Sequence, residues 1–149
     1  MKRPADLARR FLAVADRDIK TLHVLIGAAE SDDQAIGFHA QQAIEKCLKA
    51  VLSAHQIVFR KTHDLAELLD LLRDKERTLP PNADSIDTLN PFAVTLRYDL
   101  FETEAVDRDW IVKAVADVRV WAESEIQSTL KFQSATPLED RDNKASDAE

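Results

Sequence analysis

Glycine and cysteine are both scarce in this sequence of 149 residues. It contains two glycines, whereas β-rich folds and phosphate-binding loops both depend on glycine in their tight turns. Its single cysteine, Cys47, excludes a disulfide within the chain and favours a reducing compartment. The sequence therefore predicts an α-helical, cytoplasmic protein, in which we expect Cys47 to be a buried and unreactive thiol.

Long apolar runs are absent as well. No stretch approaches the roughly 20 apolar residues of a membrane-spanning helix, and the N-terminal segment MKRPADLARRFLAVADRD lacks the uninterrupted apolar core of a signal peptide. The four histidines, His23, His39, His55 and His63, do not have the spacing of a zinc site. No segment resembles a P-loop or a dinucleotide-binding fingerprint. We therefore expect no metal site and no cofactor.

Charge is plentiful but unevenly distributed. Apolar residues make up 45% of the chain and charged residues 32%, which is typical of a single folded domain. The net charge is −7, yet residues 1–63 carry a net charge of +3 and residues 64–149 one of −10. This asymmetry either orients a partner or an RNA on the basic side, or reflects solvated helix faces that happen to differ.

Hydrophobic periodicity predicts five helical segments and no strand-like alternation of useful length. The expected segments cover about residues 4–29, 32–55, 64–77, 83–96 and 106–132. Long helices with short connections favour an all-α fold, an up-and-down antiparallel bundle of four to five helices. We expect the bundle to occupy residues 1–133. Residues 134–149 should form a flexible acidic tail, because they hold too few apolar side chains to offset the entropy of ordering.

Local signals mark several ends of these segments. Asp32, or Ser31 before it, is a good N-cap for the second segment, and Asp64 followed by Glu67 is typical of a capping box. Pro91 should kink or restart the fourth segment. The inward stripe of the first segment is expected to contain Leu7, Phe11, Val14, Leu22 and Leu25.

Polar side chains occupy the apolar faces of the first two segments. At about 100° per residue, Gln41 shares one face of FHAQQAIEKCLKAVL with aliphatic side chains, and Asp18 projects from the apolar stripe of the first segment. A buried carboxylate without a partner is strongly unfavourable. We therefore predict a polar cluster of Asp18, Gln41, Arg97 and Tyr98 inside one end of the bundle. Such a cluster is either a hydrogen-bond network that sets helix register or a cleft that faces a ligand.

A second set of polar residues lies on the other side of the same segment. His39, Gln42, Lys46 and Lys49 fall within a narrow arc that either binds phosphate or a partner subunit, or is simply solvated. His63 stands just before a predicted helix N-terminus, a position that favours anions. It is therefore a candidate ligand-binding residue, with a structural role in the loop as the alternative.

Three blocks, FHAQQAIEKCLKAVL, KTHDLAELLDLL and PFAVTLRYDLFETEAV, together resemble the HEPN family, the "higher eukaryotes and prokaryotes nucleotide-binding" domains. The resemblance covers about residues 4–132. It implies an all-α bundle of four or five helices, commonly a homodimer. It also implies a small nucleotidyltransferase as partner in a toxin–antitoxin or stress pair, since prokaryotic members are often encoded beside one.

Many members of that family are metal-independent ribonucleases that use an arginine and a histidine a few residues downstream. Arg97 stands where the resemblance places that arginine, but the positions expected for the histidine hold Glu102, Thr103 and Glu104. No histidine occurs after His63. The usual proton-transfer partner is therefore missing from its usual place.

Three hypotheses follow for the function. The first is a HEPN-like nucleotide-binding or interaction module, a homodimer that partners a small nucleotidyltransferase and has no catalysis of its own. The second is a metal-independent ribonuclease that uses Arg97 with His63 or Glu102. The third is a purely structural, dimerising helical bundle whose polar interior only sets register.

Overall fold

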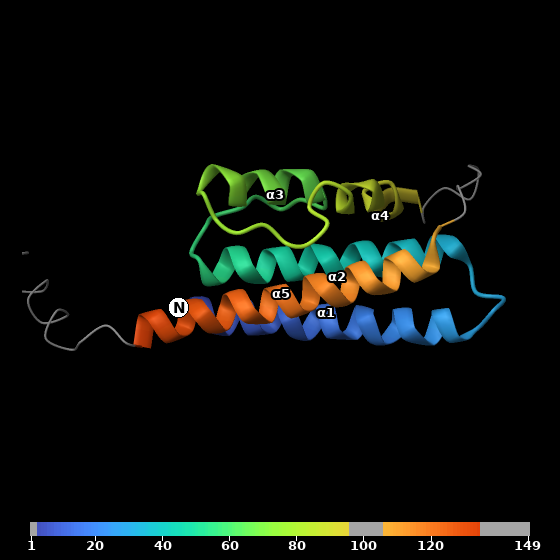
Figure 1. Cartoon of the computed structure of the whole chain (residues 1–149), viewed down its shortest axis with the longest axis horizontal. Coiled ribbons are helices and arrows are strands. Elements are labelled where there is room, and N and C mark those ends of the chain that lie inside the picture. The colour runs from blue at the N-terminus through green and yellow to red at the C-terminus, as the bar shows by residue number, and fades with distance from the viewer. Residues whose placement is uncertain (1–2, 96–105, 135–149) are drawn as a thin grey trace, which may run out of the picture.

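The computed structural model describes residues 3–95 and 106–134, and these residues form an all-α bundle (Figure 1). Its elements are α1 (Pro4–Gly27), α2 (Asp33–Ala54), α3 (Leu65–Asp74), the 3₁₀ helix η1 (Ile86–Leu89), α4 (Phe92–Thr95) and α5 (Arg108–Ser134). No strand occurs within these two ranges. The predicted fold class is therefore confirmed. None of the described helices is long and apolar enough to cross a membrane.

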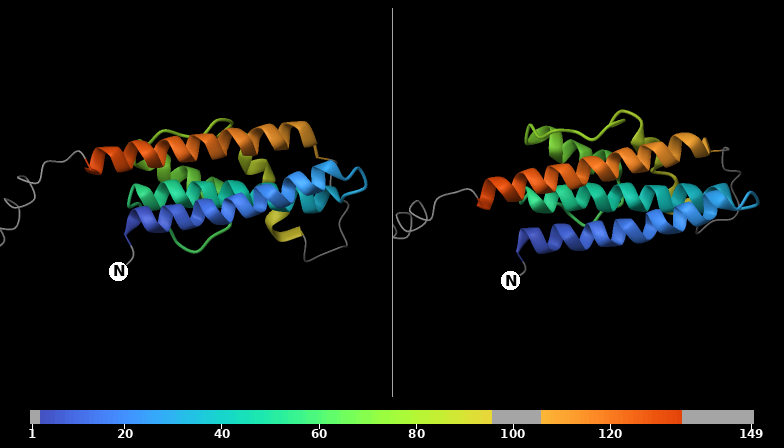
Figure 2. Two further views of the ribbon diagram at one scale, coloured as in Figure 1. Left: turned by 90° about the horizontal axis from the view of Figure 1, so that it is seen from below. Right: turned by 60° about the horizontal axis from the view of Figure 1, so that its bottom comes forward.

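Helix α2 forms the centre of the bundle. It lies between α1 and α5 in both views of Figure 2, and α3 and α4 cover another of its sides. Burial agrees with this position, since almost every residue from Ile36 to Ala54 is buried, whichever way its side chain points. Polar groups on α2 consequently need partners inside the protein.

Two of the predicted helix starts are confirmed. The Asp32 carboxylate accepts a hydrogen bond from the Gln34 backbone N–H, and the Asp64 carboxylate accepts one from the Ala66 backbone N–H at 2.9 Å. The predicted capping box at α3 is incomplete, however. Glu67 instead binds the Arg60 guanidinium through two contacts of 2.5 and 2.9 Å, which link α3 to the preceding loop.

The predicted restart of the fourth segment at Pro91 is confirmed, although residues 83–85 form a turn and are not helical. The chain forms η1, a turn at Asn90 and Pro91, and then the short α4. Pro91 lacks the backbone N–H that a continuing helix would use. Asn90 is meanwhile held elsewhere: its Oδ1 accepts from the Leu65 backbone N–H and its Nδ2 donates to the Asp64 carboxylate, both at 2.9 Å.

The inward face of α1 also differs from the prediction. Leu22 is buried as expected, but Leu7 and Val14 are 38% and 36% exposed, and Phe11 and Leu25 are only partly buried. The core-facing residues are Ala8, Leu12, Ala15 and Leu22. Small side chains at the contact allow two helices to approach closely, and this favours the alanine face of α1 over its larger aliphatic stripe.

Ion pairs fix how α5 lies against α1 and α2. Near the middle of α5 the Arg119 guanidinium binds the Asp16 carboxylate at 2.7 Å, and at the start of α5 Arg108 binds both Asp33, at 2.8 Å, and the Ser31 carbonyl, at 2.7 Å. These contacts make α5 antiparallel to α1 and place its first residue beside the start of α2. Half-exposed pairs of this kind add little stability, but they define the register of the bundle.

Candidate functional site

A buried carboxylate on α2, Glu45, forms the centre of the candidate site. Its side chain is completely buried, and four groups contact it: Lys46 Nζ at 2.5 Å, Lys49 Nζ at 3.2 Å, His63 Nδ1 at 2.7 Å and Gln41 Nε2 at 3.4 Å. An unpaired buried charge would cost several kcal/mol, so these groups are necessary for the carboxylate to be where it is. Glu45, Gln41, Lys46, Lys49 and His63 are named the Glu45 cluster below.

The Glu45 carboxylate stays ionised in this environment. Burial alone would raise the pKa of Glu45 and is the largest single influence on it. The hydrogen bond and charge of Lys46, together with the hydrogen bond from His63 and the charge of Lys49, outweigh burial and lower the pKa below its ordinary value. At neutral pH the cluster therefore holds one negative and two positive charges around an imidazole.

Gln41 connects α2 to the loop that carries His63. The side chain of Gln41 is fully buried, and its Nε2 donates to the His63 carbonyl oxygen at 2.9 Å. Its Oε1 accepts from Gln42 Nε2 at 2.6 Å. An amide suits this position because it donates and accepts at once. Gln41 thus holds the backbone of His63 in position.

His63 is the exposed member of the cluster. Its side chain is 64% exposed, while the carboxylate that holds it is completely buried. Two contacts fix the residue, Gln41 at its carbonyl and Glu45 at Nδ1. Because Nδ1 is bound to Glu45, Nε2 is the ring nitrogen left for a ligand. A histidine oriented by a carboxylate in this way can bind an anion or transfer a proton.

Of the predicted cluster of Asp18, Gln41, Arg97 and Tyr98, the structure does not bring Asp18 and Gln41 together. Asp18 binds His39 Nδ1 at 3.0 Å, whereas Gln41 binds the His63 loop. His39 and Gln41 are two residues apart on α2, and therefore about 200° apart around its axis, so they face opposite sides. Arg97 and Tyr98, like Glu102, lie outside the described residues.

The second predicted set is brought together only in part. Lys46 and Lys49 share the Glu45 carboxylate, while Gln42 binds Gln41 and His39 binds Asp18. Lys49 is nearly buried, and its Nζ lies 5.9 Å from the centroid of the Phe59 ring. The arc is therefore not a simple solvated face. It is covered by the loop before α3 and tied to α1.

Sequence reasoning missed Glu45 itself. The available signal was the spacing, since Gln41, Glu45 and Lys49 follow one another at four-residue intervals and therefore lie along one side of α2. Reading that row as a unit would have placed a carboxylate between the amide and the ammonium group. The contact to His63 could not have been found this way, because it joins residues 18 positions apart.

Neither a metal site nor a reactive thiol is present in the described part of the chain. Within residues 3–95 and 106–134, no three histidine, cysteine or acidic side chains are grouped closely enough to hold a metal ion. Cys47 is buried, as predicted, and burial raises the pKa of its thiol to about 12. A protonated, buried thiol is a poor nucleophile.

Comparison with known proteins identifies the family of this chain. The sequence profile of the HEPN domain matches residues 8–126. The crystal structure of an archaeal HEPN homologue superimposes with a TM-score of 0.60 at 22% identity, covering 85% of this chain and 99% of that one. No curated protein sequence matches. At that identity the structural likeness shows the fold alone, but the profile spans most of the chain: this protein belongs to the HEPN family.

Proposed function

We propose that this HEPN protein binds the phosphate groups of a nucleotide or an RNA at the Glu45 cluster. One observation carries the proposal: a completely buried carboxylate holds an exposed histidine at 2.7 Å and two lysine ammonium groups at 2.5 and 3.2 Å. A buried charge that orients a solvent-facing ring is costly to build for stability alone.

The charges of the cluster favour an anion. One carboxylate faces two ammonium groups and an imidazole, so the cluster is net positive whether or not His63 is protonated. Lys61, two positions before His63, is exposed and adds a further positive charge to the same loop. Phosphate oxygens accept hydrogen bonds from imidazole and ammonium groups, and such charge-assisted bonds are strong.

The proposal is tested by measuring the affinity of the purified protein for a fluorescently labelled RNA oligonucleotide and for ADP. Replacing His63 with alanine should weaken binding roughly tenfold, the equivalent of one charge-assisted hydrogen bond. His23→Ala is the matched control, since His23 is an exposed histidine on α1. Equal affinities for the wild-type and His63→Ala proteins would contradict the proposal.

A second candidate function is metal-independent RNA cleavage. The Glu45–His63 pair favours it, since a carboxylate that fixes one imidazole nitrogen prepares the other to act as a general base on a ribose hydroxyl. Arg97 would stabilise the negative charge that develops, with Glu102 as the alternative base. Cleavage in the presence of EDTA should fall about 100-fold in His63→Ala. A fully active Arg97→Ala protein would exclude the role given to Arg97.

We further propose, from family membership, that the protein is a cytoplasmic homodimer that partners a small nucleotidyltransferase in a toxin–antitoxin or stress pair. Light scattering on the purified protein tests the dimer. A neighbouring reading frame with a Gly-Ser motif followed by paired aspartates would support the partner. If the dimer forms but neither RNA nor nucleotide binds, a purely structural bundle is the remaining explanation.

A further inference from the structure

A second carboxylate–histidine pair joins α1 to α2. His39 Nδ1 lies 3.0 Å from Asp18 Oδ1, and the two side chains are 26% and 18% exposed. A carboxylate oxygen accepts hydrogen bonds, so Nδ1 supplies the hydrogen of this one. The neutral ring then carries a lone pair at Nε2, which forms no hydrogen bond with any residue in the ranges 3–95 and 106–134. His39 therefore brings a hydrogen-bond acceptor to the surface.

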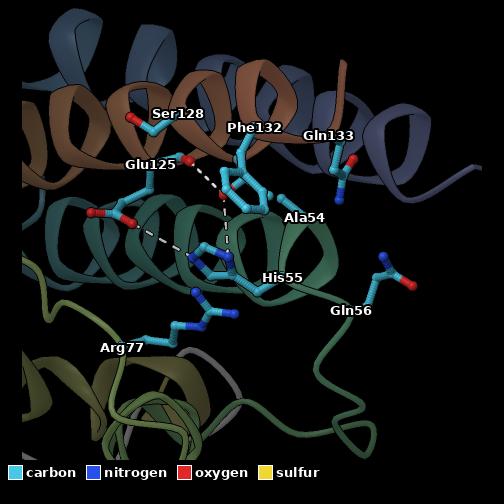
Figure 3. Close-up of a pocket in the computed structure, with 9 residues that line it drawn as sticks. Ala54, His55, Gln56, Arg77, Glu125, Ser128, Phe132 and Gln133 are labelled. Atoms are coloured by element: carbon cyan, nitrogen blue, oxygen red, sulfur yellow. Dashed lines mark hydrogen bonds and ion pairs between the residues drawn. The ribbon is translucent and has the colours of Figure 1, made fainter. Parts of the chain in front are cut away.

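His55, farther along the same helix, shows a contrasting arrangement (Figure 3). It lines a pocket of about 460 Å³ between the C-terminal ends of α2 and α5. Its side chain is only 4% exposed, with Thr129 Oγ1 3.2 Å from Nδ1 and Glu125 Oε2 3.5 Å from Nε2. Both ring nitrogens of His55 thus face groups of α5, whereas within the described part of the chain His39 is bound at Nδ1 alone.

His39 lies on the same side of α2 as part of the Glu45 cluster. His39, Gln42 and Lys46 are spaced at i, i+3 and i+7, and all three are half-buried. His39 and Lys46 are two turns apart, about 10 Å along the helix axis. Lys46 contacts the Glu45 carboxylate, which also holds His63. One elongated ligand can therefore contact the cluster and His39 at once.

An aromatic ring lies beside His39. Phe38 is half-buried, but it belongs neither to the buried core nor to the partly buried apolar residues that pack against the core. Its ring meets the His39 ring edge-on, with the ring centroids 5.2 Å apart. An aromatic side chain outside the core and beside basic groups is typical of sites on which the bases of a single-stranded nucleic acid stack.

Positive charge accompanies this surface. Arg17 precedes Asp18 on α1, Lys61 lies in the loop before α3, and both are exposed. The acidic residue of that loop, Asp64, accepts hydrogen bonds from a backbone N–H of α3 and from the Asn90 amide. Cationic groups attract the phosphates of RNA and DNA alike. A choice between the two sugars therefore needs a different kind of group.

We propose that His39, positioned by Asp18, accepts a hydrogen bond from a ribose 2′-hydroxyl and makes the site selective for single-stranded RNA over DNA. A base of the strand stacks on Phe38, while a neighbouring phosphate lies at the Glu45 cluster. The 2′-hydroxyl is the group that distinguishes RNA from DNA, and an unprotonated imidazole nitrogen accepts its hydrogen. This inference rests on the proposed binding of phosphate at the Glu45 cluster.

The test compares affinities for RNA and DNA of one sequence without uracil or thymine, about ten nucleotides long, at pH 8. The wild-type protein should prefer RNA about fivefold, the equivalent of one neutral hydrogen bond. His39→Asn should bind both equally, because its amide still donates to Asp18 but has no acceptor at the position of Nε2. His23→Asn, at an exposed histidine of α1, is the matched control and should keep the preference.

Two outcomes separate this inference from the proposed function. Equal affinity of the wild-type protein for RNA and DNA, or an unchanged preference in His39→Asn, would overturn the inference and leave phosphate binding at the Glu45 cluster intact. If the wild-type protein binds neither RNA nor DNA nor a nucleotide, both proposals fail.

Further variants and spectra test the remaining roles. Phe38→Leu should weaken binding of RNA and DNA about tenfold each without changing their ratio, and unchanged affinity would contradict the stacking. Asp18→Ala should lose the preference for RNA, since the ring is then free to turn, and a retained preference would contradict its positioning role. In ¹⁵N spectra at pH 8, His39 should be protonated on Nδ1, and its Nε2 resonance should move with RNA but not with DNA. A proton found on Nε2 in the free protein would remove the basis of the inference.

Discussion

At the scale of single residues, the candidate site depends most on Glu45. A fully buried carboxylate is stable only because Lys46, Lys49 and His63 all bind it. Glu45→Gln keeps the shape but leaves two ammonium groups without their counter-charge. We expect this variant to lose roughly 3 kcal/mol of unfolding free energy in urea denaturation. Glu67→Gln, which removes the carboxylate of the Arg60 pair at the surface, is the control and should change stability little.

The pH dependence of stability follows from the same residue. The pKa of Glu45 is lowered in the folded protein from an ordinary value of 4.5, so between these two values the unfolded chain binds more protons than the folded one. The stabilisation is fully present above pH 4.5 and is lost as the pH falls through the folded value. When the unfolding free energy is measured at decreasing pH, it should fall less steeply for Glu45→Gln than for the wild-type protein. If the unfolding free energies of the two proteins fell in the same way at acid pH, Glu45 would not be ionised in the folded state.

Cys47 gives a residue-scale test of burial. Because burial raises the pKa of its thiol to about 12, a thiol-specific reagent at pH 8 should leave the native protein unlabelled. In urea the same reagent should label one cysteine per chain rapidly. Rapid labelling of the native protein would mean that the core around α2 opens far more often than its packing implies.

At the scale of elements, the two glycines make a matched pair. A Cβ at Gly37 would lie 2.3 Å from the Phe92 ring, whereas a Cβ at Gly27 meets nothing within 4 Å. Helix propensity favours alanine at both positions by up to about 1 kcal/mol. Gly27→Ala should therefore be neutral or stabilising. Gly37→Ala should destabilise by roughly 1–3 kcal/mol, since α4 must move away from α2.

Thermal unfolding of the two variants checks this prediction. A lowered midpoint for Gly37→Ala together with an unchanged or raised one for Gly27→Ala supports the close contact between α4 and α2. Equal midpoints would show that the Phe92 ring does not occupy the space above Gly37.

The elements also show what could be predicted from the sequence. The starts of α2 and α3 were predictable, because Asp32 and Asp64 act on backbone groups two residues away. The break between η1 and α4 was also predictable, from Pro91, but the contacts that hold it were not, since Asn90 is bound by Asp64 and Leu65, some 25 positions earlier in the chain. Local pattern finds helices, caps and breaks, whereas contacts between distant segments cannot be read from it.

At the scale of the whole molecule, the candidate site combines α2 with the loop before α3. Gln41, Lys46, Lys49 and His63 stand out in the sequence one by one, because each is a polar residue in an unexpected place. Their common partner, Glu45, does not stand out, since a glutamate on a helix is ordinary. Asp18 binds His39 and does not meet Gln41, which could not be predicted because periodicity gives the side of a helix but not the residue opposite it.

If RNA binds at the Glu45 cluster, its affinity should depend on the salt concentration. If RNA phosphates contact the Glu45 cluster, affinity should fall as salt rises, because counterions are released from the RNA. Lys46→Gln should reduce the slope of log affinity against log salt by about one. Lys113→Gln, at an exposed ion pair of α5, is the control and should leave the slope unchanged.

The most direct measurement follows the His63 imidazole by NMR while a short RNA or a nucleotide is added to the full-length protein. His63 should shift in a saturable manner and before His23, whose exposed ring on α1 reports nonspecific association. Saturable binding that leaves the His63 resonances unmoved would contradict the assignment of the Glu45 cluster as the binding site.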